Sequence, residues 1–475
     1  MNRPRSPLIR SVLDRSTLPM GNDRLPAEGE PRWQLYVVHG PAEVPPFTLS
    51  AQRAQIGREP DAGDHLVLPD PSVSRIHAIL AAFPGEDTAW LQDHGSSNGV
   101  FVNGQKVDGA AIRPGDVIRL GDSLLVVGRG ALRPDDDIAE LGVLGRSSSV
   151  RELRALVKKV APSALPALIE GPTGTGKELI AQALHNESGR KGRFVALNCA
   201  ALPSTLVESM FFGHRKGAFT GATSDQDGAF VQAHGGTLFL DEVGDLGLDT
   251  QPKLLRVLET GEVFPIGATQ PIAVDVRLVA ATHVPFDQAL VQETFRRDLY
   301  TRLAGVVLRT PALSARREDI LLLFRAFLGE GNERPMSADF AQALLLNAWP
   351  GNVRELKKLA ERLLVLHGDA ARWELGMLDE EMRRPSSSPP AAQPGVVLTP
   401  ATALPSATLP TTTPLDPSPP AERDLGPPPR EDLVALLERC DGNVSRVAEL
   451  VGRNRKQIYR WMDQLAVERG TGRRG

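Results

Sequence analysis

One short segment, GPTGTGK at residues 171–177, places three glycines and a lysine directly after the apolar run LPALIE. Backbone N–H groups of such a loop, at the start of a helix, can surround a polyphosphate, and the lysine can reach its outer oxygens. The usual Ser or Thr after the lysine, a magnesium ligand, is replaced by Glu178. The motif predicts a nucleotide site made by Gly171, Pro172, Thr173, Gly174, Thr175, Gly176, Lys177 and Glu178.

A second apolar run, TLFL at residues 237–240, ends in two carboxylates, Asp241 and Glu242. Phosphoryl transfer needs a ligand for Mg²⁺ and a group that polarises the attacking water. We expect Asp241 to hold Mg²⁺ and Glu242 to act on the water. Two acids after a strand can also form a plain solvated turn, but the upstream glycine-rich loop favours an ATP-hydrolysing site.

The whole chain limits what else it can be. Its 475 residues predict about three domains, and its formal net charge of −4 means that any nucleic-acid surface must be local. The two cysteines, Cys199 and Cys440, are too far apart in the sequence to suggest a disulfide framework and fit a reducing cytoplasm. No secretion signal or membrane-spanning run of ~20 apolar residues is found, so no membrane association is expected.

Changes in sequence character predict the segments that position these groups. Short β-rich runs separated by Gly, Pro, Asp and Asn are typical of an all-β sandwich, whereas strands alternating with helices indicate an α/β parallel sheet. Proline makes up 14 of the 45 residues from 385 to 429, which favours a linker. The predicted segments are a disordered tail (1–30), an all-β sandwich (31–130), an α/β domain (138–310), a helical lid (311–383), a disordered Pro/Ser/Thr-rich linker (384–429) and a small all-α domain (430–469).

Residues 140–383 resemble the AAA+ ATPases, and within them the bacterial enhancer-binding proteins that activate sigma-54 RNA polymerase. In that family Glu commonly follows the lysine. The resemblance implies that Asn198 in VALNCA restrains the catalytic glutamate, and that Arg296 and Arg302 in FRRDLYTRL are arginine fingers for a neighbouring subunit. It therefore implies a homo-oligomeric ring, a hexamer in the family.

The same resemblance implies two residues that sense the nucleotide. Arg354 in WPGNVREL matches the lid arginine that contacts the γ-phosphate. His283 in AATH stands where many AAA+ proteins have an asparagine with a similar role. Because histidine can also donate a hydrogen bond, we expect activity to be retained.

Between the two ATP motifs lies GAFTGA, residues 217–222, which matches without a change the loop that contacts sigma-54 in this family. Its glycines let the loop rise and fold without steric penalty, and hydrolysis would then become a mechanical stroke on the polymerase. The implied contacts are Gly217, Ala218, Phe219, Thr220, Gly221 and Ala222.

The β-rich segment contains IGR (56–58), SRIH (74–77) and GSSNG (95–99), and it resembles a forkhead-associated (FHA) domain. That family binds phosphothreonine peptides, which implies Arg58 and Ser74 as phosphate contacts and Arg75, Ser97 and Asn98 as peptide contacts. The domain stands where such activators often carry a receiver domain, as in two-component signalling, and implies control by Ser/Thr kinases. The ligand would be a phosphothreonine protein or the chain's own linker, phosphorylated at Thr413.

The last segment carries a basic helix after Gly452 and resembles the Fis-type helix-turn-helix domain. A cationic second helix can lie in the major groove of upstream enhancer DNA. The candidate contacts are Arg453, Arg455, Lys456, Gln457 and Arg460.

The sequence thus predicts a multidomain, cytoplasmic bacterial transcription activator: an ATP- and Mg²⁺-dependent ring that remodels sigma-54 RNA polymerase under control of the FHA domain. A second hypothesis is a DNA-bound phosphopeptide adaptor or repressor whose ATPase is vestigial, and only His283 favours it.

Overall fold

A computed structural model of the chain describes residues 32–382, apart from 62, 83–87, 131–137, 202–203, 285, 333 and 381. The chain divides into two compact units, residues 1–393 and 394–475, and every described residue belongs to the first. The predicted tail, linker and helix-turn-helix, with Thr413 and the candidate DNA contacts, lie outside the described residues. Over the described part, no helix is long and apolar enough to cross a membrane.

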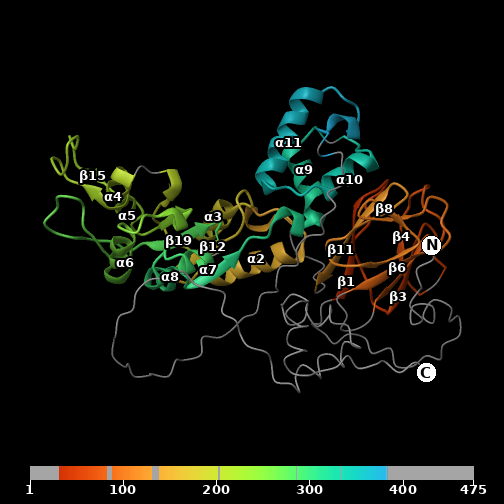
Figure 1. Cartoon of the computed structure of the whole chain (residues 1–475), viewed down its shortest axis with the longest axis horizontal. Helices are drawn as coiled ribbons and strands as arrows, with labels where there is room; N and C mark the ends of the chain where they lie inside the picture. The colour runs from red at the N-terminus through yellow and green to blue at the C-terminus, as the bar shows by residue number, and fades with distance from the viewer. Residues whose placement is uncertain are drawn as a thin grey trace, which may run out of the picture. The chain divides into compact units, whose positions relative to one another are not determined.

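The first described domain is a sandwich of two sheets, coloured red to orange in Figure 1. Its sheets have the strand orders β2-β1-β11-β10-β7-β8 and β4-β3-β5-β6-β9, which confirms the predicted all-β sandwich. The strands are β1 (Arg32–His39), β2 (Phe47–Thr48), β3 (Arg53–Gly57), β4 (Asp64–Val67), β5 (Ala78–Ala82), β6 (Ala89–Asp93), β7 (Val100–Val102), β8 (Gln105–Val107), β9 (Gly109–Ile112), β10 (Val117–Leu120) and β11 (Ser123–Gly130).

The second domain is built on a five-stranded parallel sheet of order β13-β16-β19-β12-β20. Parallel strands bring their carboxyl ends to one edge, which is where ligands bind in such sheets. Its helices and strands are α2 (Ser148–Val160), β12 (Ala167–Glu170), α3 (Lys177–Asn186), β13 (Phe194–Asn198), α4 (Ser204–Phe212), β14 (Gly213–His214), β15 (Gln226–Asp227), α5 (Ala229–Gln232), β16 (Thr237–Asp241), α6 (Gln251–Thr260), β17 (Glu262–Val263), β18 (Ile272–Ala273), β19 (Arg277–Thr282), α7 (Phe286–Val291), α8 (Arg297–Leu303) and β20 (Val306–Arg309).

A helical lid follows, drawn in teal and blue in Figure 1. It begins with two 3₁₀ turns, η4 (Leu313–Ala315) and η5 (Arg317–Asp319), and continues as α9 (Ile320–Leu328), α10 (Ala338–Leu346) and α11 (Asn352–His367). Phe324, Phe340 and Trp373 pack together in its core. Ser337 caps α10 by accepting from the Phe340 backbone N–H at 3.2 Å, a stabilising start for a helix. The predicted helical lid is confirmed.

Candidate nucleotide site and its associated loops

The glycine-rich loop leaves the carboxyl end of β12 and leads directly into α3. Gly174 has φ +79°, and a Cβ there would lie 2.3 Å from the Gly351 carbonyl oxygen, so only glycine permits this approach to the lid. Thr175 Oγ1 donates to the Pro172 carbonyl at 2.8 Å and lies 2.8 Å from Thr310 Oγ1. The loop is therefore held on one side by Thr310, which directly follows β20, and on the other side by the lid.

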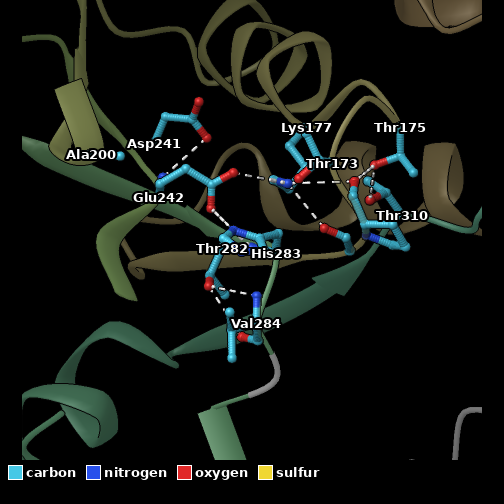
Figure 2. Close-up of polar contacts among 12 residues, drawn as sticks. Thr173, Thr175, Lys177, Ala200, Asp241, Glu242, Thr282, His283, Val284 and Thr310 are labelled. Atoms are coloured by element: carbon cyan, nitrogen blue, oxygen red, sulfur yellow. Dashed lines mark hydrogen bonds and ion pairs between the residues drawn. The ribbon is translucent and has the colours of Figure 1, made fainter. Parts of the chain in front are cut away.

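Lys177 and Glu242 face each other in this site (Figure 2). Lys177 is 6% exposed, its Nζ donates to the Gly171 carbonyl at 3.0 Å, and it lies 3.6 Å from Glu242 Oε1. Glu242 has φ +50°, a conformation that non-glycine residues adopt at a cost. That backbone turn at the end of β16 aims its carboxylate at the lysine.

His283 holds the other oxygen of the same carboxylate (Figure 2). Its Nδ1 lies 2.6 Å from Glu242 Oε2, and its backbone N–H donates to that oxygen at 3.1 Å. Because an ionised carboxylate only accepts, Nδ1 is the donor. The imidazole thus contacts the predicted catalytic base, and its expected role in sensing the nucleotide phosphate stays a prediction.

Asp241 and Asn198 lie side by side because β13 and β16 pair in register at these residues. Asn198 Nδ2 donates to Asp241 Oδ2 at 3.3 Å. Glu242, by contrast, is held by Lys177 and His283, so the expected restraint of Glu242 by Asn198 stays a prediction. Burial, and then the neighbouring Glu242 carboxylate, raises the pKa of Asp241.

The Asp241 and Glu242 carboxylates fit a divalent cation that also binds the phosphates of a nucleotide. Among the described residues, no three His, Cys, Asp or Glu side chains gather as a metal cluster. Mg²⁺ typically uses one or two carboxylates plus substrate oxygens and waters, and a cation beside Asp241 would offset the unfavourable burial of its charge. Asp241 therefore fits the predicted ligand role.

The lid closes over the loop through residues that the sequence analysis did not single out. Asn352, with φ +52°, donates from Nδ2 to the Thr173 carbonyl at 2.9 Å and accepts from the Leu313 N–H at 2.9 Å. Arg316 is buried and donates to the Thr175 carbonyl at 3.3 Å. Asn352 could have been found from its place in WPGNVREL, whereas Arg316 carried no local signal. The Arg354 side chain is exposed, and its backbone N–H donates to Gly174 at 3.2 Å.

Arg296 and Arg302 both lie on the surface at α8. Arg296 pairs with Asp298 at 2.7 Å, and Arg302 donates to the Leu258 carbonyl at 3.0 Å. An exposed guanidinium is available to a neighbouring subunit. Their role as arginine fingers stays a prediction.

The GAFTGA loop is the tip of the hairpin β14–β15. Gly217 N–H donates to the Ala222 carbonyl at 2.8 Å, which closes the loop. The Phe219 ring packs edge-on against His214, with centroids 4.9 Å apart, yet remains 38% exposed, and Thr220 is also exposed. A second loop, from β17 to β18, lies beside it because Ile266 exchanges hydrogen bonds with Gly213 and Arg215. The sequence analysis missed this second loop.

Three loops of the sandwich bring the predicted phosphopeptide residues together. The Arg58 N–H donates to the Ser74 carbonyl at 3.0 Å, and Ser97 N–H donates to Ser74 Oγ at 3.2 Å. Asn98 Nδ2 donates to the Ser72 carbonyl at 2.6 Å, and the side chains of Arg58, Arg75, Ser97 and Asn98 are exposed. His77 is buried beneath them, where its ring nitrogens contact the Ser74 N–H and the Gly99 carbonyl, so it supports the loops from inside the domain.

Family models match four stretches of the chain. They are the Sigma-54 interaction domain at residues 143–309, the FHA domain at 54–121, the AAA+ ATPase lid domain at 314–394 and the Bacterial regulatory protein, Fis family, at 430–465. Their order along the chain is the order predicted from the motifs.

Two curated proteins with similar sequences are named as transcriptional regulators. The transcriptional regulatory protein ZraR of Klebsiella oxytoca is 40% identical over 330 residues, 67% of this chain and 68% of that protein. The DNA-binding transcriptional regulator NtrC of Azospirillum brasilense is 44% identical over 261 residues, 54% and 53% of the two chains. A crystal structure of NtrX from Brucella abortus in complex with ATP is 32% identical, covering 68% and 69%, with a TM-score of 0.47.

The chain spans about half the length of the first curated relatives that it matches. It covers two thirds of the Klebsiella regulator, at an identity that leaves no doubt about shared ancestry. With its four matched domains, the chain belongs to the family of sigma-54-dependent transcriptional activators, the bacterial enhancer-binding proteins with an AAA+ domain, and carries an FHA domain before it and a Fis-type helix-turn-helix after it.

Proposed function

We propose that this protein hydrolyses ATP as a homo-oligomeric ring and uses the energy to remodel sigma-54 RNA polymerase at promoters. The observation that carries the proposal is the arrangement at the edge of the parallel sheet. Lys177, Glu242 and His283 form one chain of contacts there, next to Asp241. A lysine for phosphate, a positioned carboxylate for water and a second carboxylate for Mg²⁺ are the groups that phosphoryl transfer requires.

The chemistry follows from these contacts. Lys177 exchanges Glu242 for the outer phosphate oxygens when ATP binds, because both are anions competing for one ammonium group. The released Glu242 carboxylate orients and polarises the attacking water, while His283 keeps hold of its second oxygen. Asp241 would hold Mg²⁺, which would supply positive charge beside the phosphates. The exposed Arg296 and Arg302 act in the site of the neighbouring subunit, which makes hydrolysis depend on assembly, as a hexamer in this proposal.

The GAFTGA loop transmits the structural change that accompanies ATP hydrolysis to the polymerase. Its exposed Phe219 and Thr220 stand at the end of a hairpin that is tied to a second hairpin through Ile266. The two hairpins therefore move together when the sheet edge rearranges around the nucleotide. The Fis-type domain binds upstream DNA, the FHA domain binds a phosphothreonine protein or the linker phosphorylated at Thr413, and the whole process takes place in the bacterial cytoplasm.

The test is association of the full chain with purified sigma-54 in the presence of ADP and aluminium fluoride, followed by gel filtration. A complex that needs the nucleotide, and that weakens by about tenfold in Thr220→Ala, is expected for loss of one interface hydroxyl contact. Thr223→Ala, an exposed threonine on the same hairpin, is the matched control and should bind normally. If the parent chain and Thr223→Ala hydrolyse ATP but neither forms a complex with sigma-54, the polymerase is rejected as the target and the adaptor hypothesis is favoured.

A further inference from the structure

Three neighbouring strands of the six-stranded FHA sheet, β1, β10 and β11, bury apolar residues on both faces of the sheet. In a two-sheet sandwich the inner face normally packs on the other sheet and the outer face meets water, so strands alternate apolar and polar residues. Strand β1 instead alternates between two apolar cores: Leu35 and Val37 point into the sandwich, and Tyr36 and Val38 point the other way into a second cluster. Both sets are less than 10% exposed.

The neighbouring strands follow the same alternation. In β11, Leu125 and Val127 belong to the sandwich core, while Leu124 and Val126 belong to the second cluster and are fully buried. Val117 of β10 joins that outer set. We call Tyr36, Val38, Val117, Arg119, Leu124 and Val126 the lid-facing surface.

The second cluster is completed by the lid. It contains Ile320, Phe324 and Phe340 of α9 and α10, together with Leu344. A salt bridge crosses the same junction: Arg119 Nη1 lies 2.6 Å from Asp339 Oδ1 at the start of α10, with the arginine side chain 23% exposed. The outer face of the FHA sheet is therefore an internal docking surface whose occupant is the lid of the same chain.

The FHA domain also contacts the α/β domain and the η4–η5 segment that connects this domain to the lid helices, which we call the hinge. Tyr36 OH accepts from Arg151 Nη2 of α2, in the α/β domain, at 3.4 Å. In the η5 turn between the two subdomains, Arg317 donates to the Gly115 carbonyl of the FHA domain at 3.0 Å. The preceding residue, Arg316, is the one that donates to Thr175 in the nucleotide loop. The FHA domain thus touches the α/β domain, the lid and the hinge that connects them.

A chain of hydrogen bonds joins the phosphopeptide loops to the same junction. Asn98 donates to the Ser72 carbonyl, and Ser72 Oγ donates to Asp70 Oδ1 at 2.6 Å and accepts from the Asp122 N–H at 2.8 Å. Asp122 lies in the β10–β11 turn, whose Gly121 is so close to Ser72 that a Cβ there would lie 2.1 Å from Ser72 Oγ.

That turn is tied directly to the salt-bridge arginine. Arg119 Nε donates to the Gly121 carbonyl at 2.9 Å, while its Nη1 pairs with Asp339. Only two side chains, Ser72 and Arg119, therefore separate a predicted peptide-gripping residue from the first turn of a lid helix.

We propose that the docked FHA domain is a brake on lid movement, and that the β10–β11 turn relays phosphopeptide binding to the lid through Arg119 and Asp339. The relay rests on the proposed function of both domains. Because lid opening and product release often limit turnover in such enzymes, a body fixed to both sides of the hinge lowers the rate. A peptide that displaces the Ser72 loop shifts the turn, separates Arg119 from Asp339 and frees the lid.

The first test measures hydrogen exchange of the full chain without any ligand. Arg119→Glu places a carboxylate against Asp339 and should speed exchange in residues 320–346 by about fivefold to tenfold. The double variant with Asp339→Arg should restore the slow exchange. Arg362→Glu, which breaks an exposed 2.6 Å pair with Asp379 elsewhere in the lid, controls for charge and should leave α10 unchanged. Equal exchange in Arg119→Glu and Arg362→Glu would overturn the docking.

The relay is tested by Ser72→Ala, which removes the hydroxyl between Asp70 and Asp122 without touching the lid. It should speed exchange at 339–346, whereas Ser50→Ala, an exposed serine of the same domain, should not. Unchanged exchange in Ser72→Ala would overturn the relay even if the docking is correct.

The brake is tested by turnover. We expect ATP hydrolysis to rise by about twofold to fivefold in Arg119→Glu and to return to the parent rate in the double variant. A pool of phosphothreonine peptides with randomised flanking residues should accelerate the parent protein and have little effect on Arg119→Glu. Faster exchange without faster hydrolysis would overturn the brake. Complete lack of hydrolysis, or of binding to the pool, would instead reject the proposed function of that domain, and the exchange data would still decide the docking.

Discussion

Two regions of this molecule are proposed to bind phosphate groups, and their basic side chains lie in opposite environments. In the nucleotide site Lys177 is almost fully buried and is balanced by Glu242, which His283 holds in turn. In the FHA loops Arg58 is 43% exposed, and its ionic contact is a 4.0 Å approach to the adjacent Glu59. The Lys177 ammonium group is enclosed and paired, whereas the Arg58 guanidinium faces solvent.

The difference fits the role proposed for each site. A buried ammonium without a counter-charge would be costly, so a site that encloses its substrate needs an internal anion that the substrate can replace. A recognition surface meets its ligand at the boundary with water, where an exposed arginine costs little and still makes charge-assisted hydrogen bonds. The comparison predicts that substitutions at the first site change rates, and that substitutions at the second change affinity alone.

The largest expected effect is that of Glu242→Gln. Loss of the base should reduce ATP turnover by roughly 10²–10⁴-fold. ATP affinity should stay the same or increase, because Lys177 no longer has an anionic partner that competes with phosphate. Turnover and nucleotide titrations on the same preparation measure both quantities, and Glu187→Gln at the end of α3 is an exposed control. Weaker ATP binding in Glu242→Gln would show that the ion pair does not compete with the nucleotide.

Next in size is Arg58→Ala. Removing charge-assisted hydrogen bonds to a phosphate should weaken phosphothreonine-peptide binding by roughly 30-fold to 100-fold, with ATP affinity unchanged. Fluorescence anisotropy with a labelled peptide pool measures the first, and Arg53→Ala on β3, also an exposed arginine, is the control. An equal loss in both variants would mean that general charge, and not a defined phosphate contact, determines binding.

A smaller effect distinguishes two roles for His283. If it positions Glu242, His283→Ala should lower kcat by about threefold to tenfold with little change in KM, and His283→Asn, which retains a donor, should recover most of the rate. If it senses the γ-phosphate instead, ATP affinity should fall. Steady-state kinetics and ATP titrations on the two variants separate these roles.

The smallest expected effect is on thermal stability and concerns Glu318, in the η5 turn between the α/β domain and the lid helices. Burial, followed by the neighbouring Asp319, raises the pKa of Glu318 from 4.5 to about 8. The folded state therefore keeps a proton that the unfolded chain loses between these values, and stability should decrease as pH rises across this window. We expect Tm to fall by about 3 °C or more from about pH 6 to about pH 8.5, and to be flatter in Glu318→Gln. The same slope in both proteins would assign it to other groups.

Much of this molecule is encoded in short, local patterns. The glycine-rich loop, the carboxylates after β16 and the GAFTGA loop depend on contiguous residues whose backbone conformation or chemistry is specific. The structure places the first two at one edge of the parallel sheet and the third at the tip of a hairpin, while the roles of their residues stay predictions. The parallel sheet and the sandwich follow equally from the alternation of strand-like runs with helices in one region and with turn residues in the other.

The tertiary structure decided which residues meet. Nothing local indicates that His283 contacts Glu242, that Arg316 reaches the nucleotide loop or that Ile266 supports the GAFTGA loop, because each contact joins segments distant in sequence. The unbroken runs LYVV in β1 and LLVV in β11 did carry a signal. Apolar residues on both faces of a sandwich strand need a second covering layer. The sequence analysis predicted only the sandwich strands from these runs, and only the folded chain showed that the lid is the second covering layer, because burial depends on which segments the fold brings together.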